Sequence, residues 1–370
     1  MLLLLLLPAL GLAAPAGPCD IFAAAGNPCV AAHSTVRALY AAFSGALYQV
    51  QRTADNATLD ISVLSPGGFA NAAAQDAFCS GDCFIRRIMD QTPQANHLDV
   101  APYHVGQTGF DRPVNASRDV LQAGGQRVYS AYFEAGSGYR NDATTGMATG
   151  DEPQSIYMVT SGIHFNDECC FDYGSAETVP IDAGPGTMEA LYFGNAKGGL
   201  NHGGVGPGPW IMADLEKGLF GCNSTVSQEP TISHTFVTAM LKGDRGASPG
   251  HFALKGGDAQ AGPLRVYWDG QRPPGYAPMK KQGSIVLGIG GDNSNKSAGT
   301  FCACPKWQDP RRSCVRVSHL CGHSSPLSTH AHTHNTPAHS TDEGAIIKGY
   351  TTEATDAALQ ANIVAVGYKQ

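Results

Sequence analysis

The stretch SIYMVTSGIHF, residues 155–165, decides the fold class because it is short, rich in β-branched and aromatic residues, and bounded by turn-forming residues. These features are typical of a β-strand. They recur in HTFVTAMLKG (234–243), LRVYWDG (264–270) and GSIVLGIGG (283–291), and the chain holds 45 glycines and 23 prolines, which argues against a helical protein. We predict an all-β protein, one large β-sandwich with minor helical decoration. One helix is expected within residues 34–52, where apolar residues recur at helical spacing behind a Ser-Thr pair.

The N-terminus reads MLLLLLLPALGLAAPAG, a leucine run followed by Ala14-Pro15-Ala16. An apolar run of this length before a small-residue A-x-A site predicts a secretory signal peptide over residues 1–16, although a basic start is absent. The run is too short to cross a bilayer, and no later segment approaches the ~18 apolar residues that crossing requires. We therefore expect a secreted, extracellular protein of residues 17–370 that is not inserted in a membrane.

Cysteines, glycosylation signals and charge agree with that compartment. In an oxidising compartment disulfides are the default state of paired cysteines, but the 11 cysteines are odd in number, so at least one is unpaired or the count is abnormal. Asn56, Asn115 and Asn223 each begin an N-x-Ser/Thr glycosylation signal. The net charge is −7 and the basic residues are scattered, so we expect no nucleic-acid partner.

Residues 302–342 differ from both flanks, because they hold four of the eleven cysteines and six of the thirteen histidines without a strand or helix pattern. Three interpretations stay open. The cysteines and the His330-x-His332-x-His334 alternation could bind a metal, although the spacing matches no common zinc knuckle. The segment could be a disordered loop. It could also be translated non-coding sequence, such as a retained intron or a gene-model error.

Cys169 and Cys170 are adjacent in NDECCFDYGSAE, residues 166–177. Consecutive α-carbons lie about 3.8 Å apart, whereas ordinary disulfides prefer about 4.4–6.8 Å, so a bond between the two would be strained. Strain of this kind is normally retained only where function needs it. The alternative is that each cysteine forms a separate bridge to a distant partner.

Several runs together resemble one family: GPCDIF, NPCVAAHSTVRALYAAFSGALYQVQR, SGYRNDATTGMATGDEP, NDECCFDYGSAET, MEALYFGN, GPWIMADLE and LGIGGDNSN. They are similar to the catalytic domain of fungal α-L-arabinofuranosidase B, glycoside hydrolase family 54. The similarity covers residues 17–301 and resumes at EGAIIKGY (343–350) and ANIVAVGYK (361–369). The resemblance implies a jelly-roll or concanavalin-like β-sandwich. It also implies that the chain stops where the family's arabinose-binding β-trefoil would start, and that residues 302–342 interrupt the catalytic domain.

The resemblance assigns roles residue by residue. Glu216 matches the nucleophile and Asp214 a substrate-contacting carboxylate, both within GPWIMADLEKG. In GIGGDNSN, Asp292 matches the general acid/base, and Gly291 has a position where the backbone approaches the sugar. Cys169 and Cys170 match a vicinal disulfide that lies against the sugar ring.

The chemistry agrees with these residue types. Retaining cleavage needs one carboxylate as nucleophile and one protonated carboxyl group about 5–5.5 Å away. Burial or nearby negative charge would keep the proton on Asp292. Asp214 and Glu216 would face the same side of a strand, because they are two residues apart. Without the resemblance, Asp292 reads as a residue of an Asx-turn and Glu216 as solvated surface.

The chain also departs from the family pattern. Lys217 and Gly218 replace two asparagines that follow the nucleophile, so we place both at the substrate but expect altered sugar contacts. The family also places a tryptophan near the sugar. The stretch NAKGGLNHGGVGPGPW, residues 195–210, lacks this tryptophan, and Leu200 is the nearest apolar candidate there. The family's local disulfides match Cys19–Cys29 and Cys79–Cys83, which leaves Cys222 either free or paired with a cysteine of residues 302–342.

We expect a retaining exo-glycosidase that releases terminal α-L-arabinofuranosyl residues from arabinan and arabinoxylan, plant cell-wall polysaccharides, with β-xylosides as a minor substrate class. The alternative is a catalytically inactive, arabinose-binding β-sandwich. Two-carboxylate displacement needs neither metal nor organic cofactor, so we predict none. A monomer is expected.

Overall fold

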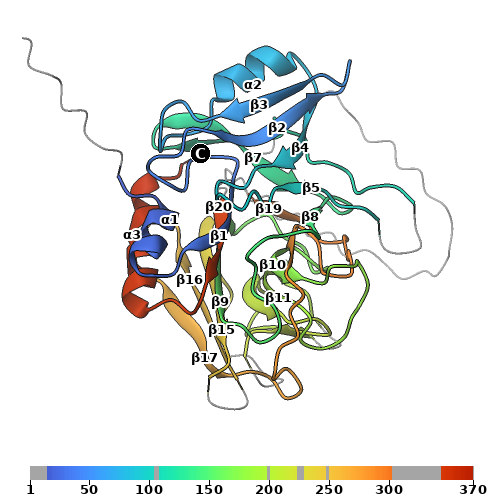
Figure 1. Cartoon of the computed structure of the whole chain (residues 1–370), viewed down its shortest axis with the longest axis vertical. Helices are drawn as coiled ribbons and strands as arrows, with labels where there is room; N and C mark the ends of the chain where they lie inside the picture. Colours follow the sequence, from blue (N-terminus) through green and yellow to red (C-terminus); the bar gives the residue numbers. More distant parts are fainter. Residues whose placement is uncertain are drawn as a thin grey trace, which may run out of the picture.

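A computed structural model describes residues 15–103, 108–197, 201–222, 229–246, 250–301 and 343–369. Within this part of the chain, two large sheets pack face to face and a small third sheet lies beside them (Figure 1). Four predicted features lie outside the described residues: residues 1–14 of the signal peptide, Leu200, Asn223 and residues 302–342. The predicted all-β sandwich with minor helices is confirmed.

The first sheet has six strands and carries the central apolar segments. In spatial order its strands are β1 (Cys29–Ser34), β20 (Glu343–Lys348), β9 (Gln154–Ser161), β15 (Phe236–Asp244), β16 (His251–Asp258) and β17 (Arg265–Gln271). All eight residues of β9 are buried because both faces of this sheet are covered. This explains why its central residues, 156–159, form a continuous apolar run instead of alternating with polar residues.

The second sheet has eleven strands, and neighbouring strands are antiparallel except for β12 and β14. Their order is β12 (Asn201–His202), β14 (Leu219–Phe220), β13 (Trp210–Asp214), β11 (Glu189–Gly194), β10 (Asp172–Ala176), β18 (Ser284–Leu287), β8 (Tyr139–Asn141), β5 (Leu98–Val100), β4 (Cys83–Ile88), β2 (Ala46–Arg52) and β3 (Thr58–Ser62). The third sheet contains β19 (Gly299–Phe301), β7 (Gln126–Phe133) and β6 (Asp119–Ala123).

The two large sheets form the sandwich core where β10, β11 and β13 pack against β9, β15 and β16. Alternating side chains of the eleven-stranded sheet, such as Tyr173, Leu191 and Ile211, point into this core. Their neighbours along the strands, such as Tyr192 and Met212, belong to a separate apolar cluster on the opposite face. That outer face carries the candidate site described below.

Three helices decorate the sandwich: α1 (Pro18–Ala24), α2 (Ala72–Cys79) and α3 (Glu353–Val366). Figure 1 shows α1 and α3 side by side next to β16, and α2 close to β3. None of the helices in the described ranges is long and apolar enough to cross a membrane. The disulfide Cys19–Cys29 joins α1 to β1, and Cys79–Cys83 joins α2 to β4. Both pairings agree with the resemblance.

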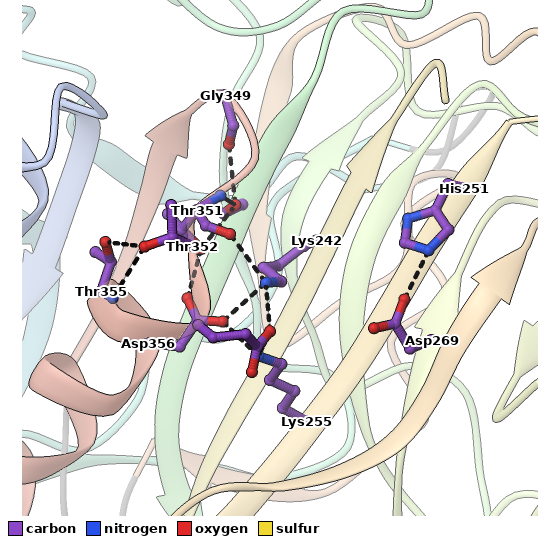
Figure 2. A network of polar contacts seen from close by, with 11 residues as sticks. Lys242, His251, Lys255, Asp269, Gly349, Thr351, Thr352, Thr355 and Asp356 are labelled. Carbon is purple, nitrogen blue, oxygen red and sulfur yellow. Dashed lines mark hydrogen bonds and ion pairs between the residues drawn. The ribbon is translucent and has the colours of Figure 1, made fainter. Parts of the chain in front are cut away.

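A buried polar network fixes α3 on the six-stranded sheet (Figure 2). The Asp356 carboxylate accepts hydrogen bonds from Lys242 Nζ at 2.8 Å, Lys255 Nζ at 2.6 Å and Thr351 Oγ1 at 2.6 Å. The helix begins just after Thr352, whose hydroxyl oxygen accepts a bond from the Thr355 amide. The helix start is therefore positioned by charge as well as by apolar packing.

The helix expected within residues 34–52 is wrong. Ser34 ends β1, and Ala46–Arg52 form β2, which pairs with both β3 and β4. Tyr48 and Val50, an aromatic and a β-branched residue, are fully buried there. Strand pairing on two sides outweighs the helical spacing of the local sequence, because a helix would leave both neighbouring strands without partners.

The chain enters and leaves residues 302–342 at strand ends. β19 ends at Phe301 and pairs with β7, whereas β20 begins at Glu343 and pairs with β1 and β9. The segment therefore connects strands of two different sheets and does not split one strand.

Candidate active site

The candidate active site lies on the outer face of the eleven-stranded sheet, where two turns and one cysteine pair meet. One turn follows β13 and carries Glu216, and the other follows β18 and carries Asp292. Cys169 and Cys170 lie just before β10, which is hydrogen-bonded to β18 and separated from β13 only by β11. Segments far apart in the sequence are therefore brought to one place by sheet order.

A cavity of about 210 Å³ lies between these segments. The volume is below the 300–1,000 Å³ usual for drug-sized ligands, which suits a single sugar unit. The cavity is lined by Cys169, Cys170, Asp182, Asp214, Glu216, Lys217, Gly218, Leu219, Gly290, Gly291, Asp292 and Ser294. All eight residues that the resemblance placed at the substrate are in this set, which shows that they are neighbours and leaves their roles as predictions.

The sequence led us to expect that Glu216 would face the cavity from a strand, on the same side as Asp214. Instead, Glu216 reaches the cavity from a tight turn. β13 ends at Asp214, Leu215 is fully buried, and Glu216 and Lys217 both have a positive φ of 63°. The Glu216 amide donates to Asp214 Oδ1 at 3.0 Å, and the Gly186 amide donates to the Leu215 carbonyl at 2.8 Å. A left-handed non-glycine residue costs about 1–3 kcal/mol, and such residues are found most often at functional sites.

Asp292 lies in an Asx-turn that faces the same cavity, so the two interpretations of this residue are compatible. Its Oδ1 accepts from the Ser294 amide at 2.8 Å, and the Gly290 amide donates to the Ser294 carbonyl at 3.0 Å. The Cys170 amide donates to the same carbonyl at 3.2 Å, which ties the cysteine pair to this turn. The turn thus fixes the carboxylate by backbone contacts.

A buried aspartate supports the Asp292 turn from behind. Asp111 accepts hydrogen bonds from Asn295 Nδ2 at 2.9 Å and from Asn293 Nδ2 at 3.3 Å. Burial raises the pKa of Asp111 to about 6, although both amides and Arg140 act in the opposite direction. Asp111 is linked to the Asp292 turn through Asn293, the residue that follows Asp292.

Cys169 and Cys170 form the vicinal disulfide that the resemblance implied, joined by a cis peptide bond. Cys170 Sγ lies 3.3 Å from Asp214 Oδ2. Cys170 packs with Tyr192, Trp210 and Leu219 in an apolar cluster, so one wall of the cavity is apolar next to the carboxylates. An apolar wall beside polar groups is the usual composition of a sugar-binding site.

The same atoms are the only candidate metal ligands among the described residues that lie close together. One ligand atom each from Cys169, Cys170 and Asp214 falls within 4.8 Å of the others. Metal binding by cysteine requires a thiolate, and these two sulfur atoms are bonded to each other. This geometry does not fit a metal centre while the disulfide is intact.

Three further carboxylates were missed by sequence reasoning. Asp182 lines the cavity and forms an ion pair with Lys217. In addition to burial, the negative charge of Asp214 raises the pKa of Asp172, and the negative charge of Glu177 raises the pKa of Glu216. The only sequence signal was that Asp172 and Glu177 fall in the run NDECCFDYGSAET, in an otherwise apolar strand and directly after it.

Crowding of these acids raises their pKa values. Burial, and then the negative charges of Glu177, Asp214, Asp292 and Asp182, raise the pKa of Glu216 to about 10. Burial raises the pKa of Asp214 to about 7, with Glu177 and Asp292 also contributing. Burial and the adjacent Asp214 raise the pKa of Asp172 well above its ordinary value. These carboxyl groups therefore retain protons at neutral pH, because the charges cannot all develop together.

Two carboxyl groups on separate turns, one buried and one partly buried, line a sugar-sized cavity of a β-sandwich beside an apolar wall. This is the arrangement of a glycoside hydrolase. The sequence matches the family described as "Alpha-L-arabinofuranosidase B, catalytic" over residues 18–304. The chain belongs to this family, and the resemblance seen in the sequence is confirmed.

Relatives in two fungi illustrate the match. The chain is 45% identical to a probable α-L-arabinofuranosidase B of Aspergillus fumigatus over 363 residues, covering 95% of this chain and 62% of the relative. It is 51% identical to α-L-arabinofuranosidase B of Aspergillus niger over 314 residues, covering 80% of this chain and 60% of the relative. The chain thus spans less than two thirds of the length of these relatives.

Solved structures give the same result. A glycoside hydrolase family 54 α-L-arabinofuranosidase soaked with a cyclic sulfate inhibitor superimposes with a TM-score of 0.80 at 42% identity, covering 95% of this chain and 66% of that chain. An arabinofuranosidase complexed with arabinofuranosyl-α-1,2-xylobiose also gives a TM-score of 0.80, at 41% identity, and covers 95% of this chain and 65% of that chain.

Proposed function

We propose that this chain is the catalytic part of a secreted, retaining α-L-arabinofuranosidase that releases terminal α-L-arabinofuranosyl residues. The observation that carries the proposal is that Glu216 and Asp292 line one cavity together with Asp214, Gly291 and the cysteine pair. A cavity of about 210 Å³ accepts one sugar unit, which favours attack on a chain end or a side-chain tip over attack within a polymer.

The mechanism follows from the two carboxyl groups. Glu216 attacks the anomeric carbon while Asp292 protonates the departing oxygen, which forms an arabinosyl ester on Glu216. Asp292, now a carboxylate, takes a proton from water, and the water opens the ester with overall retention. Asp214 is positioned to accept a hydrogen bond from a sugar hydroxyl, and the disulfide offers an apolar surface to the ring.

The substrate class is inferred from what a homologous enzyme binds. A homologous arabinofuranosidase is complexed with arabinofuranosyl-α-1,2-xylobiose, which supports arabinoxylan side chains as substrates of this chain. We include arabinan, and β-xylosides as a minor class, in the proposal. At the edge of the cavity, the Lys217–Asp182 ion pair occupies the place of the family's asparagine contacts and is expected to change affinity more than chemistry.

Secretion is proposed from the N-terminal leader of residues 1–16 together with three disulfides. Asn56 and Asn115 are both exposed, so each is accessible to glycosylation in the secretory route. Glycosylation of Asn223 is proposed from its sequence signal alone. Loss of mass on treatment with an N-glycosidase is the expected result for the secreted protein.

The test is release of 4-nitrophenol from 4-nitrophenyl α-L-arabinofuranoside by the full chain, with Glu216→Ala and Asp292→Asn as site variants. Glu229→Gln is a matched control, because Glu229 is a fully buried carboxyl group outside the cavity whose removal should leave the rate nearly unchanged. Proton NMR of the first sugar released should show the α-anomer, which establishes retention.

Two outcomes would change the conclusion. A folded chain that binds arabinose but releases no 4-nitrophenol would support the inactive, arabinose-binding sandwich instead. Activity that appears only after deletion of residues 302–340 would identify that segment as an intrusion into a functional domain, whereas equal activity in both forms would make it a tolerated connection between β19 and β20.

A further inference from the structure

Ser294 is a residue of the candidate active site to which the sequence motifs assign no role. It lies two residues after Asp292, in the turn that follows β18, and both residues line the cavity of about 210 Å³. Two groups of Ser294, its backbone amide and its hydroxyl group, contact the Asp292 carboxyl group. Ser294 is therefore a neighbour that can decide how Asp292 holds its proton.

Both groups of Ser294 bond to the same oxygen of Asp292. The Ser294 amide donates to Asp292 Oδ1 at 2.8 Å, and Ser294 Oγ donates to that oxygen at 2.5 Å. A backbone amide only donates, so Oδ1 must offer it a lone pair in every protonation state of the carboxyl group. The two oxygens of Asp292 thus have different surroundings, because Ser294 directs both of its hydrogen bonds to Oδ1.

Ser294 is held in place by the residues on either side of it. Asn293 Nδ2 donates to Asp111 Oδ1 at 3.3 Å, and Asn295 Nδ2 donates to the same oxygen at 2.9 Å. Asp111 is only 3% exposed. One buried acceptor therefore fixes both neighbours of Ser294, which limits the movement of the amide and the hydroxyl group between them.

The backbone of the turn does not depend on the Ser294 hydroxyl group. The Ser294 carbonyl accepts hydrogen bonds from the Gly290 amide at 3.0 Å and from the Cys170 amide at 3.2 Å. The Asn293 amide donates to the Gly290 carbonyl at 3.0 Å. These bonds stay when the serine is replaced by alanine, so the replacement removes one hydrogen bond to Asp292 and keeps the turn.

The hydrogen bonds from Ser294 distinguish the two oxygens of a protonated Asp292. A protonated carboxyl group has one hydroxyl oxygen, which donates, and one carbonyl oxygen, which accepts. The two Ser294 donors suit a carbonyl oxygen at Oδ1, so the proton is favoured on Oδ2. A proton on Oδ1 would compete with the hydrogen of the Ser294 hydroxyl group for the same contact.

We propose that Ser294 is a positioning residue that keeps the transferable proton of Asp292 on Oδ2 by directing two hydrogen bonds to Oδ1. This role rests on the proposed function, because that function makes Asp292 the general acid/base. A general acid is efficient only when its proton lies within hydrogen-bond reach of the group that receives it. Ser294 acts through Asp292 and takes no part in bond making itself.

The proton passes through Asp292 Oδ2 in both steps of the reaction. In the first step the Oδ2–H bond breaks and its electron pair stays on Oδ2, while the departing oxygen keeps the electron pair of its bond to the anomeric carbon and takes the proton. In the second step Oδ2 takes a proton from water, the water oxygen bonds to the anomeric carbon, and the electron pair of the ester bond returns to Glu216. The Ser294 hydroxyl group keeps its own proton throughout.

The kinetic test compares kcat/KM for two substrates that differ only in the departing group, because kcat/KM includes the step in which that group leaves. Methyl α-L-arabinofuranoside needs a proton on its departing oxygen, whereas 4-nitrophenolate leaves readily without one. In Ser294→Ala we expect kcat/KM to fall about 30-fold for the methyl substrate and less than about threefold for the 4-nitrophenyl substrate. A loss of sugar binding or of folding would lower both values alike.

Two further variants control for the hydroxyl group itself and for the loss of a buried serine. Ser294→Thr keeps a hydroxyl donor, so kcat/KM for the methyl substrate should stay within about threefold of wild type. Ser155 is a fully buried serine in β9 that lies outside the cavity and donates to the Gly349 carbonyl at 2.9 Å. Ser155→Ala should keep the ratio of the two kcat/KM values within about twofold of wild type.

A second test needs no activity. Neutron diffraction locates deuterium directly in crystals of the wild-type protein that are grown in heavy water and held acidic enough for Asp292 to carry a proton. We expect deuterium on Asp292 Oδ2, with the hydroxyl deuterium of Ser294 directed at Oδ1.

The proposal is overturned if Ser294→Ala lowers kcat/KM equally for the two substrates, if the loss for the methyl substrate is below about threefold, or if the deuterium of Asp292 lies on Oδ1. An equal loss for the methyl substrate in Ser294→Thr and Ser294→Ala would also overturn it, because the hydroxyl group would then not be what matters. A wild-type chain that releases no 4-nitrophenol would refute the proposed function, and the neutron map would still decide which oxygen carries the proton.

Discussion

Replacement of Asp356 by alanine is expected to destabilise the protein strongly, because it leaves two buried lysines without their shared partner. The side chains of Lys242 and Lys255 are 1% and 2% exposed, and that of Asp356 is 2% exposed. Both ammonium groups lie within 2.8 Å of the same Asp356 oxygen (Figure 2). The variant removes one negative charge and keeps two positive charges in a site with little water.

The magnitude follows from burial. Removing one partner of a buried ion pair costs about 3–5 kcal/mol, because the remaining charge keeps its desolvation penalty. Glu353 contacts both lysines, but its side chain is 73% exposed, so it offsets only part of this loss. Lys242 also donates to the Thr351 carbonyl at 3.0 Å and faces the Tyr350 ring at 4.3 Å. These contacts stay in the variant and keep the estimate in the lower half of the range.

The assay is equilibrium unfolding in urea, followed by tryptophan fluorescence and by far-ultraviolet circular dichroism, with Glu353→Ala as the matched control. Because Glu353 is exposed, its removal should cost less than about 1 kcal/mol and should be sensitive to salt. The Asp356→Ala loss should change little between low and high salt. The reasoning is refuted if Asp356→Ala costs less than about 1 kcal/mol, or if Glu353→Ala costs as much.

Three further predictions concern the site and the core. In thermal unfolding of the protein without ligand, the stability contributed by Asp214 should fall as pH rises from about 4 to about 7. Folding raises the pKa of Asp214 from 3.8 to about 7. Below pH 4 the group is protonated in both the folded and the unfolded state, and between pH 4 and 7 it ionises only in the unfolded state. The slope should be smaller in Asp214→Asn, and an unchanged slope would contradict this. Lys217→Asn should change KM by up to about fivefold and kcat by less, because an exposed ion pair contributes at most about 1 kcal/mol; a larger fall in kcat than in KM would place Lys217 in the chemistry. Arg37→Ala should cost about 3–5 kcal/mol in urea unfolding, because it leaves fully buried Glu343 with only Tyr157 and Tyr368 as hydroxyl partners, and a loss below about 1 kcal/mol would argue against it.

Local sequence predicted strands of the sandwich but located none of the three helices. The runs at 155–165, 234–243, 264–270 and 283–291 correspond to β9, β15, β17 and β18. Their β-branched and aromatic residues suit strands both in the buried part of a sheet, as in β9, β15 and β18, and at its edge, as in β17. The expectation of a helix over 34–52 failed because pairing of β2 with β3 and β4 is a long-range effect that has no local signature.

Motifs in the sequence determined the family and the vicinal cysteine pair, and they predicted Glu216 and Asp292 as the catalytic pair, because each lies within a short run of residues that the family shares. The sequence alone could not show how Glu216 enters the cavity. It does so through two residues with positive φ after β13, a conformation that no local pattern required.

Only the tertiary structure decided which acids surround Glu216 and Asp292. Asp172, Glu177 and Asp182 come from one segment, Asp214 and Glu216 from a second, and Asp292 from a third, and the order β13–β11–β10–β18 brings the three together. Proton affinity depends on burial and on charges close in space, so the raised pKa of Glu216 could not follow from residue types and spacing.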